Sequence, residues 1–191
     1  MSMRTMVGLY VAVLLWGTCG DVHGADEIGV YFDENAETSC IMPASYPALM
    51  YAYVVYSSPS VAEIAGFDLG VALYQIHGPM PLVLTAQAPC SADVSNLAQV
   101  SVRCPEPISC GPHTTLLSIP VFWWGGLTEI AVQEAAAPSL PITGPFVVLR
   151  DGTGLSVGRY PVWGVIDAGF DICRGLPVEG QTWGAVKGLY R

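Results

Sequence analysis

The segment AGFDLGVALY, residues 65–74, places Phe67, Leu69, Val71 and Leu73 at every second position. Successive side chains of a β-strand point to opposite faces, so these four apolar residues share one face of an extended chain. We therefore expect a half-buried strand over Ala65–Tyr74.

Further runs of strand length lie on both sides of this segment. Turn-forming pairs such as Gly78-Pro79, Gly125-Gly126 and Asp151-Gly152 separate them, and no helical pattern alternates with them. Eight or nine such strands predict an all-β fold, an antiparallel β-sandwich or a barrel. Only Thr182–Arg191 predicts a short C-terminal helix, with Thr182 as its cap. The other expected strands are Ile28–Asp33, Leu49–Ser57, Pro81–Ala86, Ala98–Arg103, Thr115–Trp124, Thr128–Gln133, Phe146–Arg150 and Val162–Phe170.

The N-terminus has the pattern of a signal peptide. Arg4 precedes an apolar run from Met6 to Trp16, which is too short to span a bilayer. Small residues follow, and a cleavage site before Asp26 would remove residues 1–25 and leave a single domain, 26–191. A lipoprotein signal that uses Cys19 is the weaker alternative, because the preceding residues match the usual motif poorly.

The charge balance excludes one class of partner. The chain has 16 Asp and Glu against 7 Lys and Arg, a net charge of −9, and removal of residues 1–25 leaves this net charge unchanged. Such a surface repels phosphate backbones and anionic membranes. We therefore expect no nucleic-acid partner. We separately expect no transmembrane segment in the mature chain.

Five cysteines follow the signal peptide, and in an exported chain they predict disulfides. Cys104 and Cys110 flank a Pro-rich segment that reads as a turn-rich loop, so we expect these two to pair. A second bridge would join two of Cys40, Cys90 and Cys173, and the sequence does not decide which two. Because five is an odd number of cysteines, one thiol stays unpaired.

Two motifs suggest chemistry, but each is incomplete. Gly154–Gly158 matches the nucleophile elbow of hydrolases around Ser156, yet no histidine follows His113 to act as the base. Asp33–Glu37 resembles the start of a calcium loop, which the later positions do not complete. We predict a hairpin or loop and a polar loop, respectively, with no catalytic, cofactor-binding or metal-binding residues. A calcium site built from acids distant in the sequence stays open.

Aromatic residues are the candidates for binding. Phe122-Trp123-Trp124, together with Tyr51, Tyr53 and Tyr56, could form a platform for a sugar or a protein. The binding candidates that we select from this set are Trp123, Trp124, Tyr51 and Tyr53. Adjacent residues of a strand face opposite sides, so we expect at least one of Trp123 and Trp124 to lie in the core.

Both ends of the chain resemble a known group of proteins. Ile28–Asp33 with Ser39-Cys40, Ile64–Leu69, and the close from Asp171-Ile172-Cys173 to Thr182–Arg191 are similar to segments of uncharacterised secreted bacterial single-domain proteins. The resemblance implies an immunoglobulin-like or cohesin-like sandwich and an exported location. It brings no catalytic or ligand-binding residues.

The sequence thus favours a non-enzymatic binding or structural module of the envelope or cell surface. The expected partner is a surface protein or a glycan, and the compartment is the periplasm, the cell surface or the extracellular space. Two alternatives remain. One is a small outer-membrane β-barrel, suggested by a mean hydropathy of +0.47. The other is a secreted hydrolase that uses carboxylates.

Overall fold

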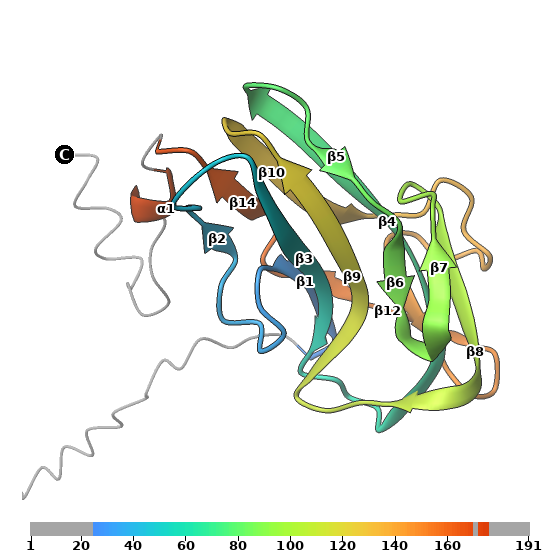
Figure 1. The fold of residues 1–191 in the computed structure, drawn as a ribbon. Helices are drawn as coiled ribbons and strands as arrows, with labels where there is room; N and C mark the ends of the chain where they lie inside the picture. The colour runs from blue at the N-terminus through green and yellow to red at the C-terminus, as the bar shows by residue number, and fades with distance from the viewer. Residues whose placement is uncertain (1–24, 170–171, 176–191) are drawn as a thin grey trace, which may run out of the picture.

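Two β-sheets packed face to face make up the chain over residues 25–169 and 172–175, which the computed structural model describes (Figure 1). Sheet 1 has the strand order β13-β1-β3-β9-β6-β7, and β5 also pairs with β9. Sheet 2 has the strand order β12-β11-β4-β10-β14-β2, and β8 also pairs with β4. The predicted all-β sandwich is confirmed. The strands of sheet 1 are β1 (Glu27–Tyr31), β3 (Ala48–Ser57), β5 (Leu82–Val83), β6 (Ala86–Ala88), β7 (Ala92–Val94), β9 (His113–Trp123) and β13 (Gly158–Arg159). Those of sheet 2 are β2 (Cys40–Ile41), β4 (Glu63–His77), β8 (Val100–Ser109), β10 (Leu127–Gln133), β11 (Phe146–Val148), β12 (Gly154–Ser156) and β14 (Gly164–Asp167).

Strand β4 is the longest in the described part of the chain and contains the predicted strand Ala65–Tyr74. Phe67, Leu69 and Val71 are buried between the sheets, as their alternation predicts, and Leu73 packs against the margin of the core. Burial of each such side chain contributes about 1.5–3 kcal/mol relative to exposure.

The opposite wall of the core comes from β3 and β9. Ten residue pairs join them, from Ala48 with Trp123 to Ser57 with His113. Ala52, Val54 and Tyr56 on β3 point inward and are fully buried. The ladder therefore sets the inner and outer faces of sheet 1.

The strand pairing differs from the prediction in two ways. Two pairs are parallel, β1 with β13 and β2 with β14. In addition, residues 105–109, expected to be a loop, belong to β8. Ile108 and Ser109 rejoin the β4 ladder after the four residues 104–107, which stand opposite the single residue Ala65. A wide bulge thus absorbs both prolines without ending the strand.

Two short helical segments complete the described elements, η1 (Pro89–Ser91) and α1 (Ile172–Gly175). The signal peptide over residues 1–25, apart from Ala25, and the helix predicted over Thr182–Arg191 lie outside the described residues, so both stay predictions.

The predicted Cys104–Cys110 bridge is wrong. Cys104 pairs with Cys90, Cys40 pairs with Cys173, and Cys110 is free. Arg103, next to Cys104, pairs with Gly66 of β4. The Cys110 amide donates to the carbonyl of Ala62, which directly precedes β4 and lies four residues before Gly66. That offset is about 13 Å along the strand, and a disulfide needs Cα atoms within about 7 Å.

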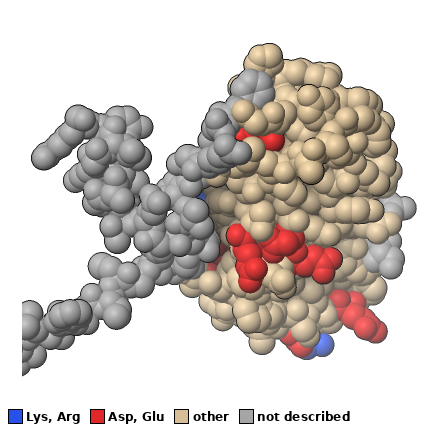
Figure 2. All heavy atoms as spheres, turned by 60° about the vertical axis from the view of Figure 1, so that its left-hand side comes forward, with Lys and Arg blue, Asp and Glu red and all other residues tan. Residues whose placement is uncertain are grey.

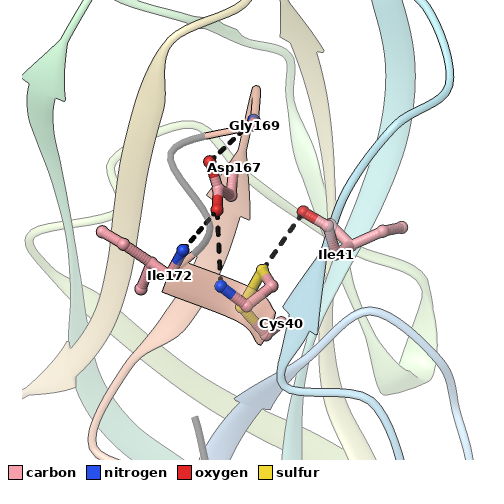
Figure 3. Close-up of a disulfide and its surroundings, with 6 residues drawn as sticks. Cys40, Ile41, Asp167, Gly169 and Ile172 are labelled. Carbon is pink, nitrogen blue, oxygen red and sulfur yellow. Dashed lines mark hydrogen bonds between the residues drawn. A yellow bond between two sulfur atoms is a disulfide. The ribbon is translucent and has the colours of Figure 1, made fainter. Parts of the chain in front are cut away.

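The Cys40–Cys173 bridge fastens α1 to the edge of sheet 2 (Figure 3). Beside it, the buried carboxylate of Asp167 accepts backbone hydrogen bonds from Gly169 at 2.9 Å, from Ile172 at 2.9 Å and from Cys173 at 3.3 Å. The bonds from Ile172 and Cys173 satisfy amides in the first turn of α1, which have no partner within a helix. One carboxylate and one disulfide therefore hold the last described turn of the chain.

Two further carboxylates fix the N-terminal part of the fold. Asp26 accepts hydrogen bonds from the Tyr56 hydroxyl and the Ser60 amide. Asp33 accepts three backbone hydrogen bonds from residues 35, 37 and 38, which close the loop after β1. Partial burial alone would raise the pKa of each carboxyl, but these hydrogen bonds outweigh it and lower both pKa values.

Peptide mapping without reduction will test the disulfides. We expect one cross-linked peptide joining Cys40 to Cys173, a second joining Cys90 to Cys104, and an alkylated Cys110. Removing the first bridge with a C40S/C173S double variant should cost about 2–5 kcal/mol of stability, measured by urea unfolding. A peptide that joins Cys104 to Cys110 would contradict this connectivity.

Acid should weaken the fold through Asp26 and Asp33. Their folded pKa values lie below the unfolded value of about 3.9, so both stabilise the fold above that pH. This contribution is lost as the pH falls through the lower folded pKa values. In thermal melts, the Tm of Asp33→Asn at pH 7 should be lower than that of the wild type. Between pH 7 and pH 2, the Tm of the variant should fall by less than that of the wild type. An equal loss in both chains would refute this role.

Candidate binding surface

The outer face of sheet 1 is the main candidate site, and its strands arrange apolar side chains on it in rows. The first row is Leu82 of β5, Phe122 of β9 and Leu49 of β3, which are paired across the strands. In the second row, Pro120 lies between Tyr51 and Leu84. The Leu84 amide donates a hydrogen bond to the Pro120 carbonyl. Paired residues on one face lie about 4.5–5.5 Å apart between Cβ atoms, so each row is continuous.

Most members of this outer face are exposed in the described structure. Large apolar side chains scattered singly are ordinary on a protein surface, whereas a contiguous set marks an interaction site. We call this set the apolar face. It consists of Leu49, Tyr51, Tyr53, Leu82, Leu84, Pro120, Phe122 and Trp124.

The structure separates the four aromatic residues predicted as binding candidates. Trp123 is fully buried, with an exposed fraction of 0%, whereas its neighbour Trp124 is 40% exposed. Tyr51 and Tyr53 lie on the apolar face, Tyr51 exposed and Tyr53 partly so. The expectation that at least one of the two tryptophans is core is therefore confirmed, and Trp123 is wrong as a binding residue because it points inward from β9.

Ring contacts hold the aromatic side chains of the apolar face in place. Phe122 and Trp124 meet edge to face, with ring centroids 4.9 Å apart and planes at 71°. Tyr51 and Tyr53 stack with centroids 6.3 Å apart and planes at 25°. Both arrangements are favourable for aromatic pairs. Rings that are already ordered lose less conformational entropy when a partner binds.

One border of the apolar face is acidic. Burial first, and then the charges of Glu34 and Asp33 together with neighbouring Tyr51, raise the pKa of Tyr53. Ala36 packs with Val55 in a small buried cluster, and Tyr53 lies against that cluster, so the loop over residues 33–37 borders this end of the face. Figure 2 shows the acidic side chains gathered in a band beside a broad surface without charge.

The cations of the described segment 25–169 lie elsewhere. Arg103 is near Asp68, Arg150 forms an ion pair with Glu63 at 3.6 Å, and Arg159 donates to the Val132 carbonyl. None of the three belongs to the strands that form the apolar face. Among the residues of 25–169, the charge beside the face is thus entirely negative.

The incomplete motifs adopt ordinary structural roles. Ser156 lies in β12, which forms an antiparallel hairpin with β11, so the elbow geometry is absent there and the predicted hairpin is confirmed. The Asp33 carboxylate bonds to its own loop, as described above. Within the described ranges, no three His, Cys, Asp or Glu residues come together as metal ligands. In the same ranges, none of the helices has the length and apolar character needed to cross a membrane.

Sequence reasoning missed half of the apolar face. Leu49, Leu82, Leu84 and Pro120 were assigned to strands but not to a surface. Their signal was present, because Leu82 and Leu84, like Phe122 and Trp124, recur at period two. Both faces of these strands are apolar, so the period alone did not reveal which face was open.

Fluorescence will test the placement of the tryptophans. In acrylamide quenching of the full chain, Trp124→Phe should lower the accessible fraction of the emission, because it removes an exposed indole. Trp123→Phe should raise that fraction, because it removes a buried one. Equal effects of the two substitutions would contradict the orientation of β9.

Comparison with known proteins gives similarity at the level of architecture. No family model matches the chain, and no curated protein matches it. Among solved structures, it is similar to a cohesin module of a Clostridium perfringens family 33 glycoside hydrolase, with 7% identity, a TM-score of 0.47, and coverage of 75% of this chain and 97% of that one. It is also similar to a type II cohesin domain from the cellulosome of Acetivibrio cellulolyticus, with 10% identity, a TM-score of 0.42, and coverage of 75% and 96%. A third is the second type II cohesin module of a cellulosomal adaptor scaffoldin of the same organism, with 14% identity, a TM-score of 0.41, and coverage of 71% and 91%.

Proposed function

We propose that this chain is an exported, non-enzymatic binding module and that it holds a partner protein against the apolar face. The observation that carries the proposal is the continuity of that face across β5, β9 and β3. The resemblance of the chain's ends to secreted bacterial proteins agrees with an exported module.

Export is supported by two features of the chain. Residues 1–25 have the order of a signal peptide. The described chain has two disulfides, Cys40–Cys173 and Cys90–Cys104, and such bonds persist in oxidising compartments. The module therefore acts in the periplasm, at the cell surface or outside the cell.

A protein fits the apolar face better than a glycan does. Interface centres are enriched in Tyr, Trp and Phe and depleted of charge, as this face is. Sugars need polar groups beside the stacking rings, whereas the residues between Tyr51 and Trp124 are Pro120, Phe122 and Leu49. The rows of aliphatic side chains thus favour a partner that buries apolar side chains.

The charge around the apolar face predicts which charged residues the partner surface carries. Acidic residues border the face, and the described arginines lie away from it. The partner surface should therefore carry apolar side chains next to Lys or Arg, which steer its approach to a chain of net charge −9.

Site-specific cross-linking will test the proposal. A photoreactive phenylalanine is placed at Tyr51, at Trp124 or, as a control, at Tyr74, and each chain is produced in the cells of its origin. Tyr74 is a matched control, because it is 43% exposed against 47% for Tyr51 but lies on β4 of the other sheet. We expect positions 51 and 124 to yield one common protein adduct that position 74 does not give.

The captured protein is then purified and titrated against variants of the full chain. Tyr51→Ser and Leu49→Ser should each weaken binding about tenfold or more, whereas Tyr74→Ser should leave the affinity unchanged. Raising the salt concentration should weaken binding further. The proposal fails if the face variants bind normally, or if the adduct at positions 51 and 124 is a carbohydrate.

A further inference from the structure

One edge of β4 is only partly paired in the described structure. β8 covers that edge from Glu63 to Leu69, and the Val71 amide then donates to the Leu97 carbonyl. Beyond Val71, no strand of the described residues pairs with this edge, although β10 continues along the other edge as far as His77.

The direction of the backbone groups follows from the register. The Val71 amide points away from β10, and backbone groups repeat their direction every second residue along a strand. Leu73 and Gln75 therefore turn their N–H and C=O groups toward the open edge, while those of Ala72 and Tyr74 point toward β10. The β4–β10 register is regular from Ala72 to Gln75, and its shift follows directly at Ile76, between the pairs Gln75–Thr128 and His77–Leu127.

The open edge borders a groove between the two sheets. The groove has a volume of about 350 Å³ and is lined by Leu73, by residues 83–85 and by residues 94–97. None of these lining residues carries a charge. A side chain that pointed inward from an added strand would therefore meet Leu73, Val83 and Leu97.

The edge also lacks the features that usually protect strands from pairing. Natural edge strands carry Lys, Pro or inward-pointing charges that block the addition of another strand. The segment from Ala72 to Gln75 has none of these, and the one irregularity, a register shift at Ile76, lies beyond it. It is therefore competent to accept a further strand.

We propose that the open edge of β4 binds an extended, uncharged segment of a partner protein, which adds to sheet 2 as a strand beside Leu73 and Gln75. The segment places aliphatic side chains in the groove at alternate positions. Leu84 belongs to both surfaces. The inference is nevertheless distinct from the proposed function, since it concerns the edge of the other sheet and a different mode of recognition.

The walls of the groove decide between a free segment and a second copy of the chain. Residues 83–85 and 94–97 lie beside the open edge. In a two-fold pairing of β4 with β4 of another copy, both sets of walls would have to occupy the space between the strands. A single extended segment brings no such walls, so it fits where a second sheet does not.

A peptide selection on the full chain will test this inference. A phage library of random twelve-residue peptides should yield uncharged sequences with aliphatic residues at alternate positions. A synthetic peptide of the enriched sequence should bind at least tenfold more weakly to Thr85→Lys and Ser95→Lys, which put a charge into the groove. It should bind normally to Thr143→Lys, which adds the same charge at an exposed residue outside the groove, and to Tyr51→Ser.

Amide hydrogen exchange supplies a second readout. In the free chain, the Leu73 and Gln75 amides should exchange faster than those of Ala72 and Tyr74, and the bound peptide should slow them. Protection of Leu73 and Gln75 in the free chain would show that the chain itself covers the edge and would overturn the inference. A dimer that Thr85→Lys disrupts would overturn it in favour of a second copy.

Loss of peptide binding in Tyr51→Ser but not in the groove variants would also overturn the inference. That outcome would leave the proposed function standing, because the peptide would then occupy the apolar face. Conversely, failure of the cross-linking at Tyr51 and Trp124 would not affect the groove. The two proposals can therefore fail separately.

Discussion

The long ladder between β3 and β9 determines most of what this molecule can do. Its ten pairs, interrupted by one register shift between Val54 and Val55, assign the side chains of both strands to the core or to the outside. Trp123 is buried in the core and Trp124 is exposed to solvent because adjacent residues of a strand point to opposite faces. A shift of one residue in this pairing would exchange the two and bury the apolar face.

The same constraint explains what could be predicted from the sequence. Alternation in β4 and β3 was enough to locate both strands and to place Tyr51 and Tyr53 opposite Ala52 and Val54. Very short strands such as β2 and β13 contain two residues each and have no period to detect. They form because other strands offer free edges, which is information from the tertiary fold.

The disulfides show the limit of reasoning from proximity in sequence. Cys104 and Cys110 are near neighbours in the chain, but β8 carries them apart along β4. Cys40 and Cys173 are separated by 133 residues, yet parallel pairing of β2 with β14 brings them together. Strand order therefore decided the connectivity, and the spacing of the cysteines did not.

The connectivity also has a consequence for how the chain matures. The native partner of Cys40 is Cys173, which is synthesised after Cys90 and Cys104, so these two become available before it. Bonding in order of emergence would join Cys40 to Cys90. The native pairs therefore require Cys40 to stay reduced until Cys173 arrives, or to exchange out of an earlier bond through a thiolate. Folding to the native pairs therefore depends either on late oxidation of Cys40 or on disulfide exchange, and not on oxidation in the order of the cysteines.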